Sequence, residues 1–342
     1  MKGRRILLDH VDGQEAAALM VDGRLEDLLI DDPATPRPGT IYRGICDRPL
    51  KGQGGMMVRV PGGTAWLRGA KGLRPGQAVL CQVTGVAEDG KAVPVTDRIL
   101  HKSRHAIVTP GAPGHNVSRR IADEEERTRL RAIAEDAMEG DFGLILRSGA
   151  EGAPDAEIAE DIAAMLALAE AVAQDAGGTE PETLTEGDGP HTLAWREWRA
   201  DDVATDAGCF ASQGVLDLIA DLHDPVVQLD PGTMVVERTR ALVAVDVNTG
   251  TDTSPAAALK VNLAAARGLP RALRLRGFGG QVVVDFAPMS KAQRSQVEQS
   301  LRASFRNDGI ETSLVGWTAM GLFELQRKRE RAAILPLIGG VR

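Results

Sequence analysis

Short apolar runs separated by glycine and aspartate fill the first hundred residues, a pattern typical of strands joined by tight turns. Residues 6–8, 16–21 and 28–30 form the first three runs, and a proline-rich connector follows at residues 32–39. The next runs are Ile41–Cys46, Met56–Val60, Thr64–Leu67, Ala78–Thr84 and Val93–Ile99. Five short strands this close together predict a small β-barrel.

The middle of the chain changes to the spacing of three and four residues that marks helices. One helix with an acidic first turn precedes the apolar run Gly143–Leu146, which predicts a buried strand. A longer helix with an apolar inner face begins at Pro154. Residues 177–190 are polar and rich in glycine, proline and glutamate, so we expect a loop there. Trp195 and Trp198 are expected to pack into a core.

Strands alternate with helices in the last third of the chain, which predicts a layered α/β domain. Ser254 and Ser290 mark two helix starts, and Pro270 is expected to kink the first of these helices. The predicted strands are Val226–Leu229, Thr233–Glu237, Leu242–Val245, Gln281–Val284 and Glu311–Val315.

Two aspartates come where strands of this domain should end. Asp246 follows the apolar run 241–245, and Asp285 follows the run 282–284. Carboxylates at the ends of neighbouring core strands can share one divalent cation. An alternative is that each aspartate only caps the turn after its strand, because aspartate is common in turns.

Composition and charge restrict the function classes without choosing among them. Hydrophobic residues make up 43% of the 342 residues and charged residues 26%, which is typical of a globular protein. The formal net charge of −8 argues against indiscriminate polyanion binding but allows a local basic groove. No apolar run is long enough to cross a membrane and the first residues do not form a signal peptide, so we expect no membrane association and a cytoplasmic location. Three widely separated cysteines indicate neither a disulfide framework nor a zinc site.

The segments around the two aspartates resemble the catalytic core of the ribonuclease E/G family. That resemblance rests first on Val245-Asp246-Val247-Asn248-Thr249-Gly250 and Val283-Val284-Asp285-Phe286. Further elements fall in the family's order over residues 40–330: Val117-Ser118-Arg119-Arg120-Ile121, Gly143-Leu144-Ile145-Leu146-Arg147-Ser148, Asn262-Leu263, Leu273-Arg274-Leu275-Arg276, Gly279-Gly280 and Gly321–Arg327.

The resemblance implies a metal-dependent endoribonuclease that cuts single-stranded RNA, leaves 5′-phosphate products and senses a 5′-terminal monophosphate. It implies that Asp246, Asn248 and Asp285 are catalytic, with Asp246 and Asp285 holding Mg²⁺ (or Mn²⁺). Arg147 and Ser148 are implied to bind the 5′-terminal phosphate, a role that suits a guanidinium beside a hydroxyl. An alternative for Arg147 is an ion pair with a nearby acid.

The remaining candidate residues are basic or aromatic side chains expected to contact RNA. They are Arg59, Trp66, Lys102, Arg119, Arg120, Arg274 and Arg276. Few aromatic residues stand on the expected barrel, so Arg59, Arg68, Lys71 and Lys102 are expected to do more of the binding there than base stacking does.

The resemblance also implies a multidomain α+β and α/β architecture with an OB-fold barrel near the N-terminus and a C-terminal deoxyribonuclease-like catalytic domain. We expect N-terminal strands at 1–38, the RNA-binding barrel at 39–105, the 5′-sensor region at 106–180, a reduced ribonuclease-H-like segment at 181–223 and the catalytic domain at 224–342. The N-terminal strands are expected to pack with the ribonuclease-H-like segment.

Two departures from the family bear on activity and assembly. Pro288 stands where the family often has a third carboxylate, which could weaken metal binding. The family's zinc-binding Cys-Pro-x-Cys element and small dimerisation domain do not follow, so we expect no zinc and a monomer or dimer without zinc-linked assembly. The rival interpretations are an RNA-binding protein with weakened or lost cleavage, and another metal-dependent phosphodiesterase that acts on DNA or a nucleotide.

Overall fold

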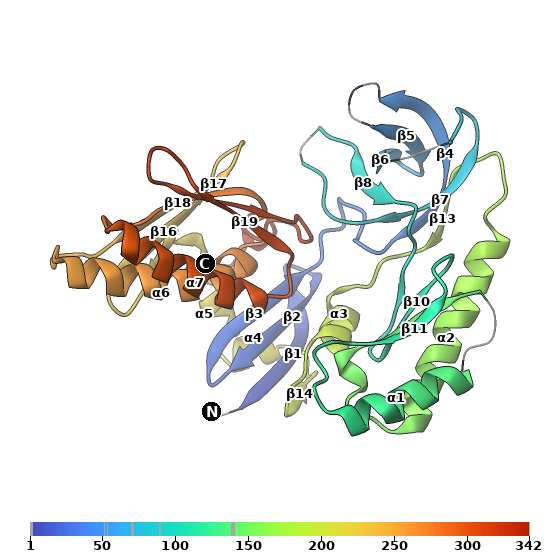
Figure 1. Ribbon diagram of the computed structural model, residues 1–342, viewed down its shortest axis with the longest axis horizontal. Coiled ribbons are helices and arrows are strands. Elements are labelled where there is room, and N and C mark those ends of the chain that lie inside the picture. The colour runs from blue at the N-terminus through green and yellow to red at the C-terminus, as the bar shows by residue number, and fades with distance from the viewer. Residues whose placement is uncertain are drawn as a thin grey trace. The chain divides into compact units, whose positions relative to one another are not determined.

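The computed structural model describes residues 3–50, 52, 54–69, 72–88, 90–137 and 141–341. The chain has a mixed α+β fold with two compact units (Figure 1). The first unit combines residues 1–33 with residues 200–342, and the second comprises residues 34–199. The described residues include no helix that is both long and apolar enough to cross a membrane. The five domain boundaries expected from the sequence stay predictions.

The predicted barrel is confirmed as a closed five-stranded barrel in the second unit. Its strands are β4 (Ile41–Leu50), β5 (Gly55–Val60), β6 (Gly63–Arg68), β7 (Ala78–Val83) and β8 (Val93–Thr96). They pair in the order β4-β5-β6-β8-β7, and β7 pairs back with β4. Inward residues such as Val58, Leu67 and Cys81 are fully buried. The stretch predicted as a loop contains β13 (Glu182–Thr185), which pairs with β4 outside the barrel.

The same unit also contains a four-stranded sheet against which two helices pack. The strands β9 (His101–Lys102), β10 (Ala106–Thr109), β11 (Gly114–Val117) and β12 (Gly143–Leu146) pair in the order β11-β12-β10-β9. The helices are α1 (Glu124–Ala137) and α2 (Asp155–Gln174), and the unit also contains the 3₁₀ turn η1 (Ser148–Ala150) and α3 (Pro190–Glu197). Trp198 is buried as expected, but Trp195 is 56% exposed, so its predicted core position is wrong. Instead, Arg104 lies over the Trp195 ring, 4.5 Å from its centroid.

The first unit begins with the three predicted strands, now β1 (Arg4–Val11), β2 (Gln14–Val21) and β3 (Arg24–Ile30). Asp12-Gly13 and Asp22-Gly23 join them, and all four residues have positive φ. Two such residues in succession form the two-residue turn that matches the twist of a hairpin. The strand β14 (Asp202–Ala204) adds in parallel to β1. The short helical segments that accompany this sheet are α4 (Cys209–Ser212), α5 (Val215–Ala220), η2 (Asp221–His223) and η3 (Leu335–Ile338).

The predicted α/β layer is a six-stranded sheet with two helices packed on one face (Figure 1). The strands are β15 (Val226–Gln228), β16 (Thr233–Arg238), β17 (Val243–Asn248), β18 (Gly280–Asp285), β19 (Thr312–Trp317) and β20 (Phe323–Arg327), in the order β15-β16-β17-β18-β20-β19. The helices are α6 (Pro255–Leu275) and α7 (Lys291–Arg306). The serine side chains predicted as caps, Ser254 and Ser290, accept backbone hydrogen bonds as expected. Pro270 lies inside α6 without ending it.

A buried charge network ties β3, α6 and β20 together within this unit. Asp308 is only 8% exposed, and its two carboxylate oxygens accept hydrogen bonds from Arg274 and Arg327. Arg274 also donates to the Glu26 carboxylate at 2.7 Å, and Arg331 pairs with Asp27. Buried charges of this kind persist because each has an opposite partner.

Asp308→Ala should lower the free energy of unfolding of this unit by about 3–5 kcal/mol, because it leaves two buried guanidiniums without their shared carboxylate. Chemical denaturation followed by circular dichroism measures the change. Glu298→Ala is the matched control: its ion pair with Arg302 is at the surface, so its loss should change stability by less than about 1 kcal/mol. Equal effects of the two substitutions would contradict the importance of the buried network.

Candidate active site

The two aspartates that the sequence places at strand ends lie side by side, although only Asp285 ends its strand and Asp246 is inside β17. β17 and β18 are parallel neighbours, and their register pairs Asp246 directly with Asp285. Neighbouring strands lie about 4.8 Å apart, and paired residues point to the same side of the sheet. The pair is therefore close enough for both carboxylates to reach one cation.

Strict alternation along both strands places this pair on the face away from the helices. In β17, Val243, Val245 and Val247 are buried beneath α6 and α7. Asp246 and Asn248, which alternate with them, are exposed. β18 repeats the pattern, with buried Val284 preceding exposed Asp285. The period of two that forms the core thus also presents the carboxylates to solvent.

Asn248 belongs to the same site through a direct contact. It stands two residues after Asp246, so both side chains leave the same face of β17. The Asn248 Nδ2 donates a hydrogen bond of 2.8 Å to Asp246 Oδ2. A neutral donor fixes the orientation of the Asp246 carboxylate and adds no negative charge beside Asp285.

A set of two carboxylates suits Mg²⁺ better than a metal that needs a full protein cage. Mg²⁺ is commonly held by one or two carboxylates, while water and substrate phosphate complete its six ligands. Among the described residues, no group of three or more His, Cys, Asp and Glu side chains is arranged to hold a metal ion. The solvent-facing pair, with Asn248 as an orienting neighbour, fits that chemistry.

A buried asparagine that the sequence interpretation did not assign to the site holds the segment after Asp285. Asn262 on α6 is fully buried. Its amide donates to the Ala287 carbonyl at 2.9 Å and accepts from the Ala287 N–H at 3.0 Å. This segment leads from the strand end to α7, so Asn262 fixes the backbone just beyond the carboxylate. In the sequence, this role is indicated only by the position of Asn262, a polar residue among the apolar positions of α6.

Arg147 stands at the exit of β12, as predicted, with Ser148 beginning η1. The Arg147 guanidinium has two partners: its Nη1 donates to the Ser103 carbonyl at 2.5 Å, and its Nη2 pairs with Glu197 at the same distance. The ion pair that the sequence left open for Arg147 is therefore present. Within the described part of the chain, the Ser148 hydroxyl forms no hydrogen bond.

Further arginines surround this strand exit. Arg199 donates to the backbone carbonyl of Ser148. Burial lowers the pKa of Arg104 below its usual value, and the charges of Arg199 and Arg147 lower it further. The charges of Asp161 and Glu157 act in the opposite direction and raise the pKa of Arg104, so acids as well as arginines lie near this strand exit.

Five other predicted RNA contacts lie at the surface of the second unit. Arg59 on β5 is exposed and Trp66 on β6 is half-buried; Trp66 pairs with Met57, two residues from Arg59, so the two side chains are near neighbours. Lys102, Arg119 and Arg120 are exposed outside the barrel. Lys71 lies outside the described residues. The structure thus brings together one arginine and one aromatic on the barrel wall.

Arg274 and Arg276 have partners inside the protein instead. Arg274 belongs to the network of Asp308 and Glu26. Arg276 is only 4% exposed, and it donates to the Asp224 carbonyl at 2.8 Å. Burial and internal pairing argue against direct RNA contact at both positions. The sequence revealed their charge but not their partners.

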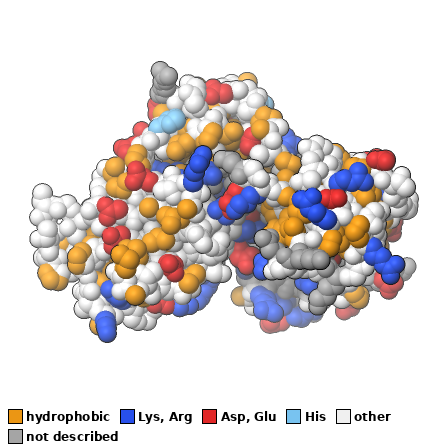
Figure 2. All heavy atoms as spheres, turned by 90° about the horizontal axis from the view of Figure 1, so that it is seen from above, with side chains coloured by type: hydrophobic (Ala, Val, Ile, Leu, Met, Phe, Trp, Pro, Cys, Tyr) orange, Lys and Arg blue, Asp and Glu red, His pale blue; other side chains and the backbone are white. Residues whose placement is uncertain are grey.

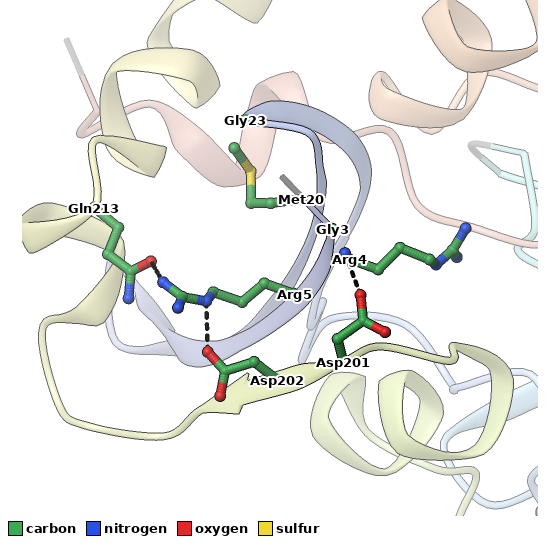
Figure 3. A pocket seen from close by; sticks show the side chains of 8 residues that line it. All are labelled: Gly3, Arg4, Arg5, Met20, Gly23, Asp201, Asp202 and Gln213. Atoms are coloured by element: carbon green, nitrogen blue, oxygen red, sulfur yellow. Dashed lines mark hydrogen bonds and ion pairs between the residues drawn. The ribbon is translucent and has the colours of Figure 1, made fainter. Parts of the chain in front are cut away.

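A small cavity in the first unit is separate from these residues (Figure 3). Its volume is about 150 Å³. The Arg5 guanidinium at its wall is paired with Asp202 at 2.6 Å and with Gln213 at 2.8 Å. These charged and polar groups satisfy one another, so they do not identify a ligand.

Comparisons with known proteins agree on one family. The sequence model of the Ribonuclease E/G family matches residues 102–206 and 199–330. Ribonuclease E of Nostoc sp. is 32% identical over 309 residues, which cover 78% of this chain and 45% of that protein. Ribonuclease G of Escherichia coli is 28% identical over 305 residues, covering 77% and 62%. Ribonuclease E of Synechocystis sp. is 28% identical, covering 95% and 57%. The chain therefore spans about half to three fifths of the length of these relatives.

Asn262→Ala should lower the free energy of unfolding by about 2–4 kcal/mol, because it leaves the buried N–H and carbonyl of Ala287 without partners. Urea denaturation of the variant and the parent protein measures the loss. Asn248→Ala provides the comparison: its side chain is exposed, so its removal should cost less than about 0.5 kcal/mol. A stability loss at Asn262 as small as that at Asn248 would contradict the anchoring role.

Proposed function

Because the chain belongs to the Ribonuclease E/G family, we propose that it is a metal-dependent endoribonuclease acting on single-stranded RNA. The observation that carries the proposal is the direct pairing of Asp246 with Asp285 on the exposed face of the sheet. An exposed carboxylate pair is accessible to a large polymeric substrate, whereas a pair enclosed in a cavity is not.

Asp246 and Asp285 would hold Mg²⁺, which polarises a phosphoryl oxygen and lowers the pKa of a bound water. Asn248 keeps the Asp246 carboxylate in the orientation needed to bind. Asn262 holds the chain after Asp285 and so preserves the separation of the two carboxylates. Cleavage that leaves the phosphate on the downstream fragment would give a 5′-phosphate product.

RNA contact would depend on local groups rather than on overall charge. Figure 2 shows a face on which Lys and Arg side chains lie scattered among acidic and apolar ones, and the net charge is −8. Arg59 with Trp66 can hold one phosphate and stack one base. Lys102, Arg119 and Arg120 are further exposed cations that can contact the RNA backbone.

Arg147 and Ser148 would bind the 5′-terminal monophosphate of the RNA. A guanidinium and a hydroxyl can hold phosphate oxygens from two directions. The charges of Arg104 and Arg199 add to the attraction of an anion, and those of Asp161 and Glu157 reduce it. A terminal phosphate carries more charge than an internal phosphodiester, so it should bind the Arg147 guanidinium better.

Asp246→Asn and Asp285→Asn should each lower Mg²⁺-dependent RNA cleavage by roughly a hundredfold to a thousandfold. They should also weaken the binding of Mn²⁺ measured by isothermal titration calorimetry, because a single carboxylate is left. Glu311→Gln, which removes an exposed carboxylate outside this pair, should change neither property. If both aspartate variants cleaved RNA at the rate of the parent protein, the catalytic site would lie elsewhere. RNA binding without Mg²⁺-dependent cleavage by the parent protein would favour a binding protein instead.

RNA with a 5′-monophosphate should be cleaved about tenfold to a hundredfold faster than the same RNA with a 5′-hydroxyl, because charge-assisted hydrogen bonds contribute about 1.5–3 kcal/mol. Arg147→Ala should remove this preference and leave the 5′-hydroxyl rate nearly unchanged. Single-turnover assays with both substrates provide the measurement, and Arg131→Ala on α1 is the control for loss of an exposed arginine. Equal rates on the two substrates with the parent protein would argue against a 5′ sensor.

A further inference from the structure

We propose that Glu197 is a resident competitor in the phosphate site, which the 5′-terminal phosphate of the RNA must displace from Arg147. The inference rests on the proposed function of Arg147 and Ser148 and adds a residue that regulates the affinity of that site. It starts from one contact: the anion now bound to the Arg147 guanidinium is a side chain of the protein itself.

The Glu197 carboxylate is divided between two arginines. Its Oε2 accepts from Arg147 Nη2 at 2.5 Å, and its Oε1 accepts from Arg196 Nε at 2.8 Å. Arg196 is held in turn by Asp188. If a phosphate replaced Oε2 on Arg147, Glu197 would keep Arg196 as its partner. The displaced carboxylate would therefore not be left without a positive neighbour, which lowers the cost of displacement.

The backbone at Glu197 is fixed, while its side chain is accessible. Glu197 is the last residue of α3, and Ala194 and Trp198 on either side of this turn are buried. The Glu197 side chain is 39% exposed. A ligand can therefore reach the carboxylate, and the carboxylate can swing away without unfolding α3.

Glu197 stays charged under ordinary conditions. Partial burial alone would raise its pKa, but the charges of Arg147 and Arg196 and their hydrogen bonds lower the pKa below its usual value. The competitor therefore carries its negative charge at neutral pH.

The charges of the rival anions decide which of them can enter. An internal phosphodiester carries one negative charge and must replace a carboxylate of equal charge that is already tethered in place. A terminal monophosphate carries about −1.5 to −2 charges at pH 7 and three free oxygens. It can bind Arg147 and still offer an oxygen to the Ser148 hydroxyl. Only the terminal phosphate therefore binds Arg147 strongly enough to offset the cost of displacing Glu197. Internal phosphates do not displace it.

Substitution of Glu197 should change the affinity for 5′-monophosphorylated RNA in one direction if it is a competitor, and in the opposite direction if its role is only structural. Without the competitor, binding of a terminal phosphate to Arg147 no longer includes the free-energy cost of displacing Glu197, so its affinity rises by that full amount. An internal phosphate binds Arg147 more weakly, so its affinity rises less. Glu197→Gln should therefore tighten binding of 5′-monophosphorylated RNA by about tenfold and that of 5′-hydroxyl RNA by about threefold or less. If Glu197 only held Arg147 in position, the same substitution would weaken binding of the 5′-monophosphate.

The experiment uses fluorescence anisotropy with a non-cleavable 2′-O-methyl oligonucleotide that carries either a 5′-monophosphate or a 5′-hydroxyl. The variants are Glu197→Gln, Glu197→Asp, Arg147→Ala and the double variant Glu197→Gln with Arg147→Ala. Glu197→Asp keeps the charge but shortens the side chain, so its affinity should lie between those of the parent protein and Glu197→Gln. Glu182→Gln, which breaks the Arg43 ion pair in the same unit, is the matched control and should change nothing.

The results separate this inference from the proposed sensor. A gain with Glu197→Gln that disappears in the double variant supports the competitor, even if the parent protein shows little preference for the 5′-monophosphate. Unchanged or weaker binding by Glu197→Gln, while Arg147→Ala still loses the preference, overturns the competitor and leaves the sensor intact. No preference in the parent protein and none in Glu197→Gln overturns both. Thermal melting of every variant verifies that each is folded.

Discussion

The register between β17 and β18 is the constraint on which the candidate site depends. Side chains alternate along a strand, so a slip of one residue would turn every side chain to the other face. Here the same alternation buries Val245 and Val284 and exposes Asp246 and Asp285. A slipped register would put a carboxylate into the apolar layer under α6 and α7. The hydrophobic core therefore fixes the position of the carboxylates as firmly as it fixes the sheet.

The connection between these two strands explains why they can be parallel neighbours. Parallel strands need a crossover, and α6 provides it because it lies between β17 and β18 in the chain. Pro255 at the start and the Ser254 cap define where this helix begins. Asn262 then joins the helix to the segment beyond Asp285 through both polar groups of one peptide unit. The helix thus provides the crossover between the two strands and also holds the segment that follows one of them.

Local signals in the sequence were sufficient for the barrel and for the pairing of the two aspartates, although β17 continues past Asp246 to Asn248. Each barrel strand is an apolar run between turn residues, and each aspartate directly follows such a run. β13 was missed because it is a strand only through pairing with β4, more than a hundred residues away in sequence. Trp195 was misplaced because spacing does not reveal whether a partner such as Arg104 covers the ring at the surface. The partners of Arg274 and Arg276 depend on long-range packing that local periodicity does not encode.

Arginine content alone is consequently a poor guide to RNA contact in this chain. Arg327 and Arg274 are held by Asp308, and their charges stabilise the protein rather than attract a ligand. Arg147 is also paired, yet its partner Glu197 is partly exposed and shared with Arg196. The difference lies in what happens when an anion approaches. Asp308 cannot leave without uncovering two buried cations, whereas Glu197 can release one arginine and keep the other. An ion pair is therefore compatible with a binding site when its acid retains a second partner and can reach solvent.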